Sequence, residues 1–385
     1  MLQRNILRQS VKGVRTFGSH GPQHGVWSNR EKPAALKLKD EEVYRDLMNK
    51  IEPGKGPASI KNMSQRWSYH SPLLIDETFK VAYDLLEQES EKCYNRIDEI
   101  KKQLEQGSSA DSSTASRLRD ELATLEVDAE KFNPEVLYNV EYFPESVDRS
   151  LPVYRKYLER KWKEYDLPVT MQRLEQLHVI PDTMPTLDPK ANVKVKFGHN
   201  TEPELAGWIT PGRLLPSFAV SSPPTISVQE FDGINDKSLY SVLLVNPDTP
   251  DVPANSFKTS LHYGLCNISL NYVENTIKPL DLLLNPENRV FKEYVPLLPE
   301  KNAQVQRACL WVFRQEKELS NVQFSSDNFD IRAFAQENAL TAVGAHVWRQ
   351  QFDRSVNGLR EKYGLEKGRV FHRVRRPYPL ANHDD

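Results

Sequence analysis

Two short runs of the sequence, residues 239–245 and 309–313, are apolar at nearly every position. Alternate side chains of a strand point to opposite faces, so a strand formed by either run has two apolar faces. Such a strand needs a covering layer on each side, and runs this short suit strands better than buried helices. The sequence therefore predicts central strands in a layered β domain.

The surrounding region, residues 169–365, is predicted to be mainly β. Val193, Val195 and Phe197 alternate with Lys194 and Lys196, which predicts a half-exposed strand. Proline-rich segments at 222–224, 248–253 and 296–299 separate the apolar runs. Short strands broken by turn signals favour an antiparallel β-sandwich. A closing helix is predicted from residues that share one helical face: Trp348, Phe352, Val356, Leu359 and Tyr363.

Residues 73–168 have helical periodicity. Apolar residues recur at spacings of three, four or seven in two stretches separated by a polar turn at 107–113. Two such helices should pack antiparallel along their apolar stripes, either against the β domain or as a projection that binds a neighbouring protein. The stripes are Phe79, Ala82, Leu86, Cys93, Ile97, Ile100 and Leu104, and then Leu118, Leu122, Leu125, Ala129 and Phe132.

A third helical piece, residues 153–165, is rich in basic and aromatic side chains, and Asp166, Leu167 and Pro168 are predicted to end it. Such a mixture can bind RNA phosphates and stack on bases, although it also occurs on ordinary surface helices. The candidate RNA contacts here are Arg155, Arg160 and Lys161.

The first 17 residues have the composition of a mitochondrial transit peptide. Basic residues recur among apolar ones, and the first acid is Glu31. The alternative is a flexible basic tail. Residues 18–72 are polar and rich in glycine and proline, which predicts an extended arm that is ordered only against a partner. Trp27 and Trp67 either dock this arm on another macromolecule or tuck back onto its own domain.

Composition excludes several classes of protein. The chain has 51 basic and 53 acidic residues, so its overall charge of −2 does not indicate a nucleic-acid binder. No apolar run approaches the roughly 20 residues of a membrane span. The three cysteines, Cys93, Cys266 and Cys309, are far apart, so neither a disulfide scaffold nor a zinc site is expected, and we expect no cofactor.

The carboxy-terminal tail, residues 366–385, carries a local cluster of positive charge. Five basic residues fall within ten positions that contain no acid, with Phe371 and His372 between them. Such a segment can neutralise several phosphates, and the alternative is a solvated tail. The candidate RNA contacts are Lys367, Arg369, Arg373, Arg375 and Arg376.

Several segments together resemble the phosphatidylethanolamine-binding proteins. Asn246 to Pro250 is similar to the D-P-D-x-P motif of that family, and His262 begins a segment similar to its H-F-x-V-x-N strand. The resemblance implies the fold of this family, a β-sandwich with a carboxy-terminal helix. The similar segments are 179–182, 224–228, 231–233, 239–242, 246–250, 262–268 and 294–315.

The resemblance also implies a pocket for anionic headgroups, which this chain has altered. Asn246 stands where the family has the first aspartate of its motif, and Gln306 and Ala308 replace the histidine and tyrosine of its H-R-Y triplet. Asn302 and Gln304 replace two glycines. His262 is kept, and we interpret it as a satisfied core residue. The degenerate pocket is expected at Asn246, Asp248, His262, Gln306 and Arg307.

An altered pocket behind a transit peptide and long extensions resembles the members of this family found in the mitochondrial large ribosomal subunit. That resemblance implies a structural, non-enzymatic protein of the matrix, bound to ribosomal RNA and to neighbouring proteins of the central protuberance, with no small-molecule substrate. The alternative is an anion- or headgroup-binding or signalling protein of the parent family. The sequence contains no G-x-S-x-G motif, metal-ligand cluster or spaced carboxylate pair that would indicate an enzyme.

Overall fold

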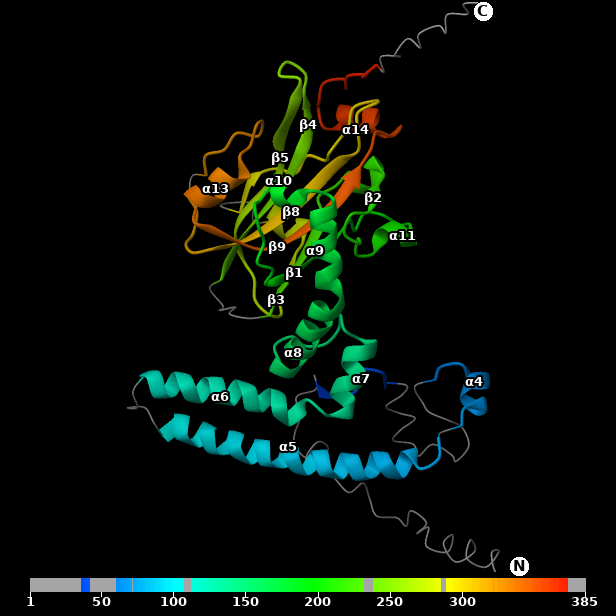
Figure 1. The fold of residues 1–385 in the computed structure, drawn as a ribbon, viewed down its shortest axis with the longest axis vertical. Helices are drawn as coiled ribbons and strands as arrows, with labels where there is room; N and C mark the ends of the chain where they lie inside the picture. The colour runs from blue at the N-terminus through cyan, green and yellow to red at the C-terminus, as the bar shows by residue number, and fades with distance from the viewer. Residues whose placement is uncertain are drawn as a thin grey trace, which may run out of the picture. The chain divides into compact units, whose positions relative to one another are not determined.

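The computed structural model describes residues 36–41, 60–70, 72–106, 112–231, 238–284, 289–320 and 322–372. Contacts between Cα atoms divide the chain into two compact units, Met1–Tyr157 and Leu158–Asp385. Each unit is described by itself below, with the element labels of Figure 1.

The amino-terminal unit is helical and contains the predicted antiparallel hairpin. Within it, Ile97 and Ile100 are buried on the stripe that faces α6. The Ser90 hydroxyl donates to the Ala129 carbonyl at 2.7 Å, which fixes where the far end of α6 meets α5. The predicted helical region is therefore confirmed. Its helices are α4 (Met63–Ser68), α5 (Ile75–Gln106), α6 (Ser112–Glu130) and α7 (Pro134–Tyr142), and α8 (Pro152–Lys161) begins here.

Part of the predicted arm packs against α7. The Lys39 amide donates to Asn139 Oδ1 at 3.0 Å, and Asn139 Nδ2 donates to the Lys37 carbonyl at 2.9 Å. Leu36 is buried beside them. The buried Asn139 side chain thus both accepts from and donates to the backbone of the arm, as a paired strand would. This stretch of the arm is therefore held by contacts within its own unit. Trp67 on α4 is 63% exposed, and Trp27 lies outside the described residues.

The third helical piece does not end at Pro168, so that prediction was wrong. Helix α8 is followed directly by a π-helical turn, η3 (Trp162–Asp166), and then by α9 (Leu167–Gln176). The Leu167 amide donates to the Trp162 carbonyl, five residues back, instead of four. A proline lacks an amide hydrogen and crowds the preceding turn, and the wider π turn accommodates both defects.

The carboxy-terminal unit is built on two sheets. The larger has strand order β2-β9-β8-β4-β5-β7, and the smaller has order β1-β3-β6; all pairs are antiparallel except β2 with β9. The strands are β1 (Ala191–Lys196), β2 (Leu214–Leu215), β3 (Thr225–Glu230), β4 (Leu239–Asp251), β5 (Ser256–Ser269), β6 (Thr276–Ile277), β7 (Val290–Lys292), β8 (Gln306–Gln315) and β9 (Leu340–Gln350).

Short helices complete this unit. They are α10 (Val179–Asp182), α11 (Pro203–Ala206), η4 (Ser217–Val220), α12 (Pro279–Leu284), α13 (Ile331–Glu337) and α14 (Val356–Lys362). Helices α9, α10 and α13 contribute to a core on one face of the six-stranded sheet, and the three-stranded sheet contributes to the core on its other face.

The two covering layers explain the fully apolar runs. On β4, Val242 and Leu244 belong to the core shared with the small sheet, whereas Leu243 and Val245 belong to the core beneath the helices. The corresponding strand β8 lies beside β4 at the centre of the sheet. The predicted central strands are confirmed, as is the alternation of β1, which is buried at Val193 and half-buried at the lysines.

The closing helix is shorter than predicted. Trp348 does not belong to it: this residue lies in β9, is fully buried and pairs with Ala308 of β8. Helix α14 begins only at Val356. Trp348 and Phe352 are four residues apart and so match a helical spacing, but Trp348 lies in β9 and Phe352 lies between β9 and α14. The pairing with β8 decides the conformation of Trp348.

Candidate functional site

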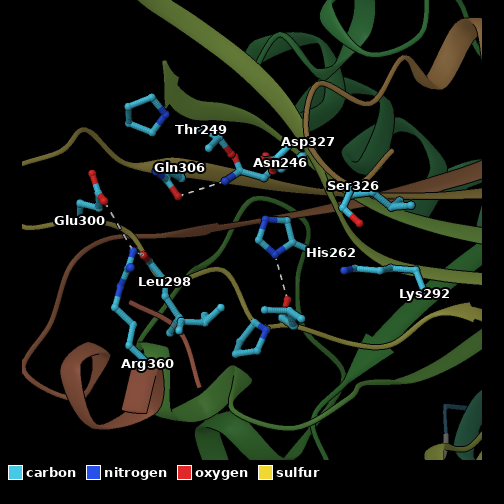
Figure 2. Close-up of a pocket in the computed structure, with 16 residues that line it drawn as sticks. Asn246, Thr249, His262, Lys292, Leu298, Glu300, Gln306, Ser326, Asp327 and Arg360 are labelled. Atoms are coloured by element: carbon cyan, nitrogen blue, oxygen red, sulfur yellow. Dashed lines mark hydrogen bonds and ion pairs between the residues drawn. The ribbon is translucent and has the colours of Figure 1, made fainter. Parts of the chain in front are cut away.

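The candidate site is a cleft of about 290 Å³ at one end of β4, β5 and β8 (Figure 2). Asn246 of β4, His262 of β5 and Gln306 of β8 line it together, so the structure brings these three predicted residues to one place. Asp248 and Arg307 do not line this cleft. They border a second hollow of about 580 Å³, which shares Pro250 and Gln306 with the cleft.

Two of the polar groups in the cleft are bonded to each other. Asn246 Nδ2 donates to Gln306 Oε1 at 3.1 Å, and Asn246 Oδ1 accepts from the Asp248 amide at 2.9 Å. Both side chains are buried. Because a buried amide is costly to leave unpaired, opening this pair for a ligand would require equally good replacement bonds. The donor of Asn246 and the acceptor of Gln306 that form this pair are therefore not available to a ligand.

His262 is held neutral. Its Nδ1 lies 2.9 Å from the Val295 carbonyl, an acceptor, so Nδ1 carries the hydrogen and Nε2 is left as an acceptor. Burial lowers the pKa of His262 to about 4, and the bond to Val295 opposes that shift only in part. A neutral imidazole with a free lone pair does not attract an anion, so this histidine suits a core role better than anion binding.

The charges around the cleft balance. Lys292 and Arg360 line it together with Glu300 and Asp327. Arg360 Nη2 donates to the Leu298 carbonyl at 2.9 Å and lies 3.9 Å from Glu300, as Figure 2 shows. Two cations against two carboxylates leave no excess of positive charge with which to bind a phosphate.

Sequence reasoning missed seven polar residues of the cleft: Thr249, Ser260, Lys292, Glu300, Ser326, Asp327 and Arg360. Thr249 Oγ1, Ser260 Oγ and Arg360 Nε are buried without a hydrogen-bond partner among the described residues. Ser260 lies two residues before His262 on β5, but a bulge at His262 breaks the alternation of the strand, so spacing alone does not place both in one cleft. Arg360 could not have been found either, since it comes from α14, and the sequence gives no sign that this helix reaches the cleft.

Arg307 is a structural clamp. Its Nη2 lies 2.6 Å from Asp248 Oδ1, and its Nε and backbone amide both donate to Asp248 Oδ2 at 2.8 Å. Its Nη1 donates to the carbonyls of Leu177 and His178 and pairs with Asp182 at 2.8 Å. The clamp ties the start of β8 to β4 and to the chain that follows α9.

The environment of Arg307 keeps it charged. Burial alone would lower the pKa of this guanidinium, but the hydrogen bonds to Asp248 and Asp182 raise it above its ordinary value. The side chain is only 17% exposed. Because each of its three guanidinium nitrogens donates to a protein oxygen, Arg307 has little capacity left for an external anion.

The loop that carries Asn302 and Gln304 holds the carboxy-terminal segment. Asn302 has a φ of 66°, a left-handed conformation that asparagine tolerates better than most residues. Its Nδ2 donates to the Phe371 carbonyl at 2.7 Å, and the Phe371 amide donates to the Lys301 carbonyl at 3.0 Å. Ala308 lies in the core between the sheets and does not line the cleft.

The RNA-contact candidates are dispersed. Lys367 and Arg369 are exposed just before the tail is anchored at Phe371, and Arg160 and Lys161 are exposed on α8. Arg155 is half-buried, and its Nη1 donates to the carbonyls of Arg149 and Ser150. Arg373, Arg375 and Arg376 lie outside the described residues.

The cysteines differ in exposure. Cys266 and Cys309 are buried free thiols and Cys93 is a half-buried one, and burial raises the pKa of Cys266 to about 11. In the described part of the chain, His, Cys, Asp and Glu side chains do not gather into a group that could hold a metal ion. Likewise, none of the described helices is both long and apolar enough to cross a membrane.

Residues 206–349 match the family model described as phosphatidylethanolamine-binding protein, which confirms the predicted fold class. The large ribosomal subunit protein mL38 of Schizosaccharomyces pombe is 26% identical over 309 residues, covering 79% of this chain and 92% of that protein. A Drosophila melanogaster protein named "Putative odorant-binding protein A5" is 23% identical over 207 residues, covering 50% of this chain and 86% of that one.

Two solved structures are also similar. Carboxypeptidase Y inhibitor complexed with its cognate proteinase is 14% identical with a TM-score of 0.39, covering 50% of this chain and 99% of that one. Phosphatidylethanolamine-binding protein from Plasmodium vivax is 15% identical with a TM-score of 0.37, covering 48% of this chain and 98% of that one.

We predict that the substitution Arg307→Met lowers the free energy of unfolding by about 3 kcal/mol, because it removes the cation that pairs with Asp248 and Asp182 and the donor of two backbone carbonyls, and leaves Asp248 with only the backbone amide of residue 307. Arg307→Lys should cost less, since an ammonium group keeps the charge but cannot span all of these acceptors. Urea unfolding of the full chain measures both, with the exposed Arg354→Met as the control. A stability of Arg307→Met equal to that of the unsubstituted chain would disprove the clamp.

Two histidines, the buried His346 and the half-buried His262, predict loss of stability in acid. His262 and His346 have folded pKa values of about 4, lowered by burial from 6.5. Between these values the unfolded chain binds more protons than the folded one, so stability is present above pH 6.5 and falls as the pH drops towards 4. Each histidine contributes a slope approaching about 1.4 kcal/mol per pH unit.

Chemical unfolding at a series of pH values measures that slope. His346→Gln keeps a donor for the Ile209 carbonyl, which His346 Nε2 contacts at 3.0 Å, but cannot become charged. This variant should therefore flatten the slope, whereas the same change at the exposed His70 should not. An unchanged slope in His346→Gln would show that His346 does not titrate as described.

Proposed function

We propose that this chain is a structural, non-enzymatic constituent of the mitochondrial large ribosomal subunit. The observation that carries the proposal is the extent of the similarity to mL38. The aligned 309 residues far exceed the domain matched at 206–349, so the alignment must include residues outside that domain. The odorant-binding relative, in contrast, aligns with only 50% of the chain.

The chemistry of the cleft supports a role without catalysis. A cleft that binds anionic headgroups needs donors and excess positive charge, whereas this one has a neutral His262 and a bonded Asn246–Gln306 pair. These groups also lack the acid-base capacity that a hydrolytic site requires. The cleft therefore acts as part of the scaffold, and partners are contacted by surfaces and extensions.

The anchored tail supports contact with ribosomal RNA. The chain is held at Phe371 by Lys301 and Asn302, and the basic residues Arg373, Arg375 and Arg376 follow directly in the sequence. An anchored start lowers the entropy cost of placing these charges on a phosphate backbone. We assign the tail, together with Lys367 and Arg369, to RNA contact.

The amino terminus supports import into the matrix. Its first 17 residues combine basic and apolar side chains without an acid, a composition that suits a membrane potential negative inside. We extend the proposal to the central protuberance and to its neighbouring proteins, on the basis of the resemblance stated from the sequence. The described part of the chain offers these partners the helices of the amino-terminal unit.

Sedimentation of a mitochondrial extract tests the proposal. In a gradient containing EDTA and moderate salt, which separates the ribosomal subunits, we expect the chain to migrate with the large-subunit RNA. Retention should follow from several phosphate contacts and from protein contacts that salt does not disrupt.

A matched pair of variants tests the tail. A chain that ends at His372 should leave the large subunit at lower salt than the full chain, whereas Arg354→Gln, an exposed control far from the tail in sequence, should not. If the full chain stays at the top of the gradient, the ribosomal proposal fails. If the full chain migrates with the large subunit and the chain that ends at His372 is retained at the same salt concentrations, the RNA assignment of the tail fails and the ribosomal role stands.

A further inference from the structure

The second hollow, of about 580 Å³, is bordered by the end of α9, by α10, by the hairpin of β4 and β5, and by residues of β8 and β9. The hairpin continues past Val245, the last residue of β4 that pairs with β8 (Figure 1). The volume lies in the range of about 300–1,000 Å³ that is usual for sites of small molecules. The hollow is therefore large enough to take a planar group from a partner.

Arg349 is the cation of this hollow that the protein leaves available. It lies directly opposite Arg307 on the neighbouring strand. Arg307 is neutralised by Asp248 and Asp182. The side chain of Arg349, in contrast, donates only through Nε, to the Gly212 carbonyl at 2.9 Å, and no described residue accepts from its Nη1 or Nη2. The half-buried Arg349 therefore offers two guanidinium nitrogens to an external acceptor.

Phe257 gives the hollow an aromatic wall. Its side chain is 61% exposed near the tip of the hairpin, where it pairs in register with Pro250. Unpaired RNA bases are commonly bound by stacking on an aromatic side chain, because every base has a π-face. The ring of Phe257 is therefore suited to a planar ligand.

The charges of the hollow favour a neutral ligand over an anion. Two carboxylates, Asp182 and Asp248, line it. The two arginines of the hollow, Arg307 and Arg349, carry the same total of opposite charge, so a phosphate or carboxylate would gain little. Asp182 is 45% exposed, its Oδ2 pairs with Arg307, and its Oδ1 accepts from no group in the described part of the chain. The hollow thus offers donors and an acceptor together.

A guanine base has the matching chemistry. Its O6 and N7 are adjacent acceptors that one arginine binds with two donors. Adenine has an amino group in place of O6, and a guanidinium cannot accept from it. The opposite edge of guanine carries N–H donors, which suit a carboxylate such as Asp182.

We propose that this hollow binds an unpaired guanine base of ribosomal RNA, with the ring stacked on Phe257 and with O6 and N7 bound by Arg349. The assignment rests on the proposed function and names a nucleotide site for it. The basic tail contacts phosphates, which carry no sequence information, whereas a base held in the hollow would fix the position of the chain on one RNA segment.

Probing the large subunit with dimethyl sulfate, which methylates guanine at N7, tests the proposal. Subunits come from cells whose only copy of the chain is unsubstituted or carries Arg349→Met, with the exposed Arg354→Met as the control. We expect one guanine to be methylated at least about fivefold more with Arg349→Met, because the arginine no longer shields N7. The control should match the unsubstituted chain at that guanine.

A second variant keeps the test independent of the bond between Arg349 and Gly212. Phe257→Leu retains an apolar side chain on the exposed hairpin but removes the ring, so methylation of the same guanine should rise at least about twofold. If Arg349→Met does not enter the subunit, Phe257→Leu decides the question.

Three results would overturn the proposal: an unchanged methylation pattern in both variants, changes at different nucleotides in the two variants, or a change at an adenine instead of a guanine. Sedimentation of the same samples separates these results from failure of the proposed function. If the chain migrates with the large subunit and one of these results is obtained, the ribosomal role stands and the guanine site does not. If the unsubstituted chain does not migrate with the subunit, both fail.

Discussion

The ion pair between Arg307 and Asp248 is the interaction on which the arrangement of the carboxy-terminal unit depends. One guanidinium bonds both oxygens of Asp248, reaches Asp182 and takes the carbonyls of Leu177 and His178. It thereby connects the central strands to the chain that leads from α9 to α10. The helices of this region cover one face of the six-stranded sheet, so the clamp helps to hold that layer on the sheet. A charge used in this way cannot also serve as a receptor for anions.

Polar side chains of the cleft and of the neighbouring loop are likewise bonded within the protein. Asn246 and Gln306 bond each other, His262 bonds Val295, and Asn302 holds Phe371. Polar groups that would bind a ligand in a receptor form hydrogen bonds with other groups of this protein, which removes the cost of burying them unpaired. The proposed contact with RNA therefore rests on residues outside the cleft, in the basic tail and at Arg349 and Phe257.

Much of the fold could be predicted because positions that face a covering layer carry apolar residues and positions that face water carry polar ones. The central strands carry apolar residues on both faces, and β1 alternates, so their environments were visible in the sequence. Trp348 was misplaced because a strand that is apolar on both faces also satisfies helical spacing. Pro168 was misread because a π turn can accommodate proline, and single residues do not signal that turn. In the cleft, the motif comparison found Asn246, His262 and Gln306, but the direction of Arg307 and the reach of Arg360 depend on tertiary packing.

The proposed function requires that the cleft serves only as part of the scaffold and that residues outside it contact the partners. Replacing Asn246 and Gln306 together by leucine tests it most directly, because the double change removes the cleft's bonded amide pair without leaving one amide unpaired. In cells whose only copy of the protein carries both changes, we predict that mitochondrial translation is retained. Loss of translation, with the variant folded and present in the large subunit, would contradict the account.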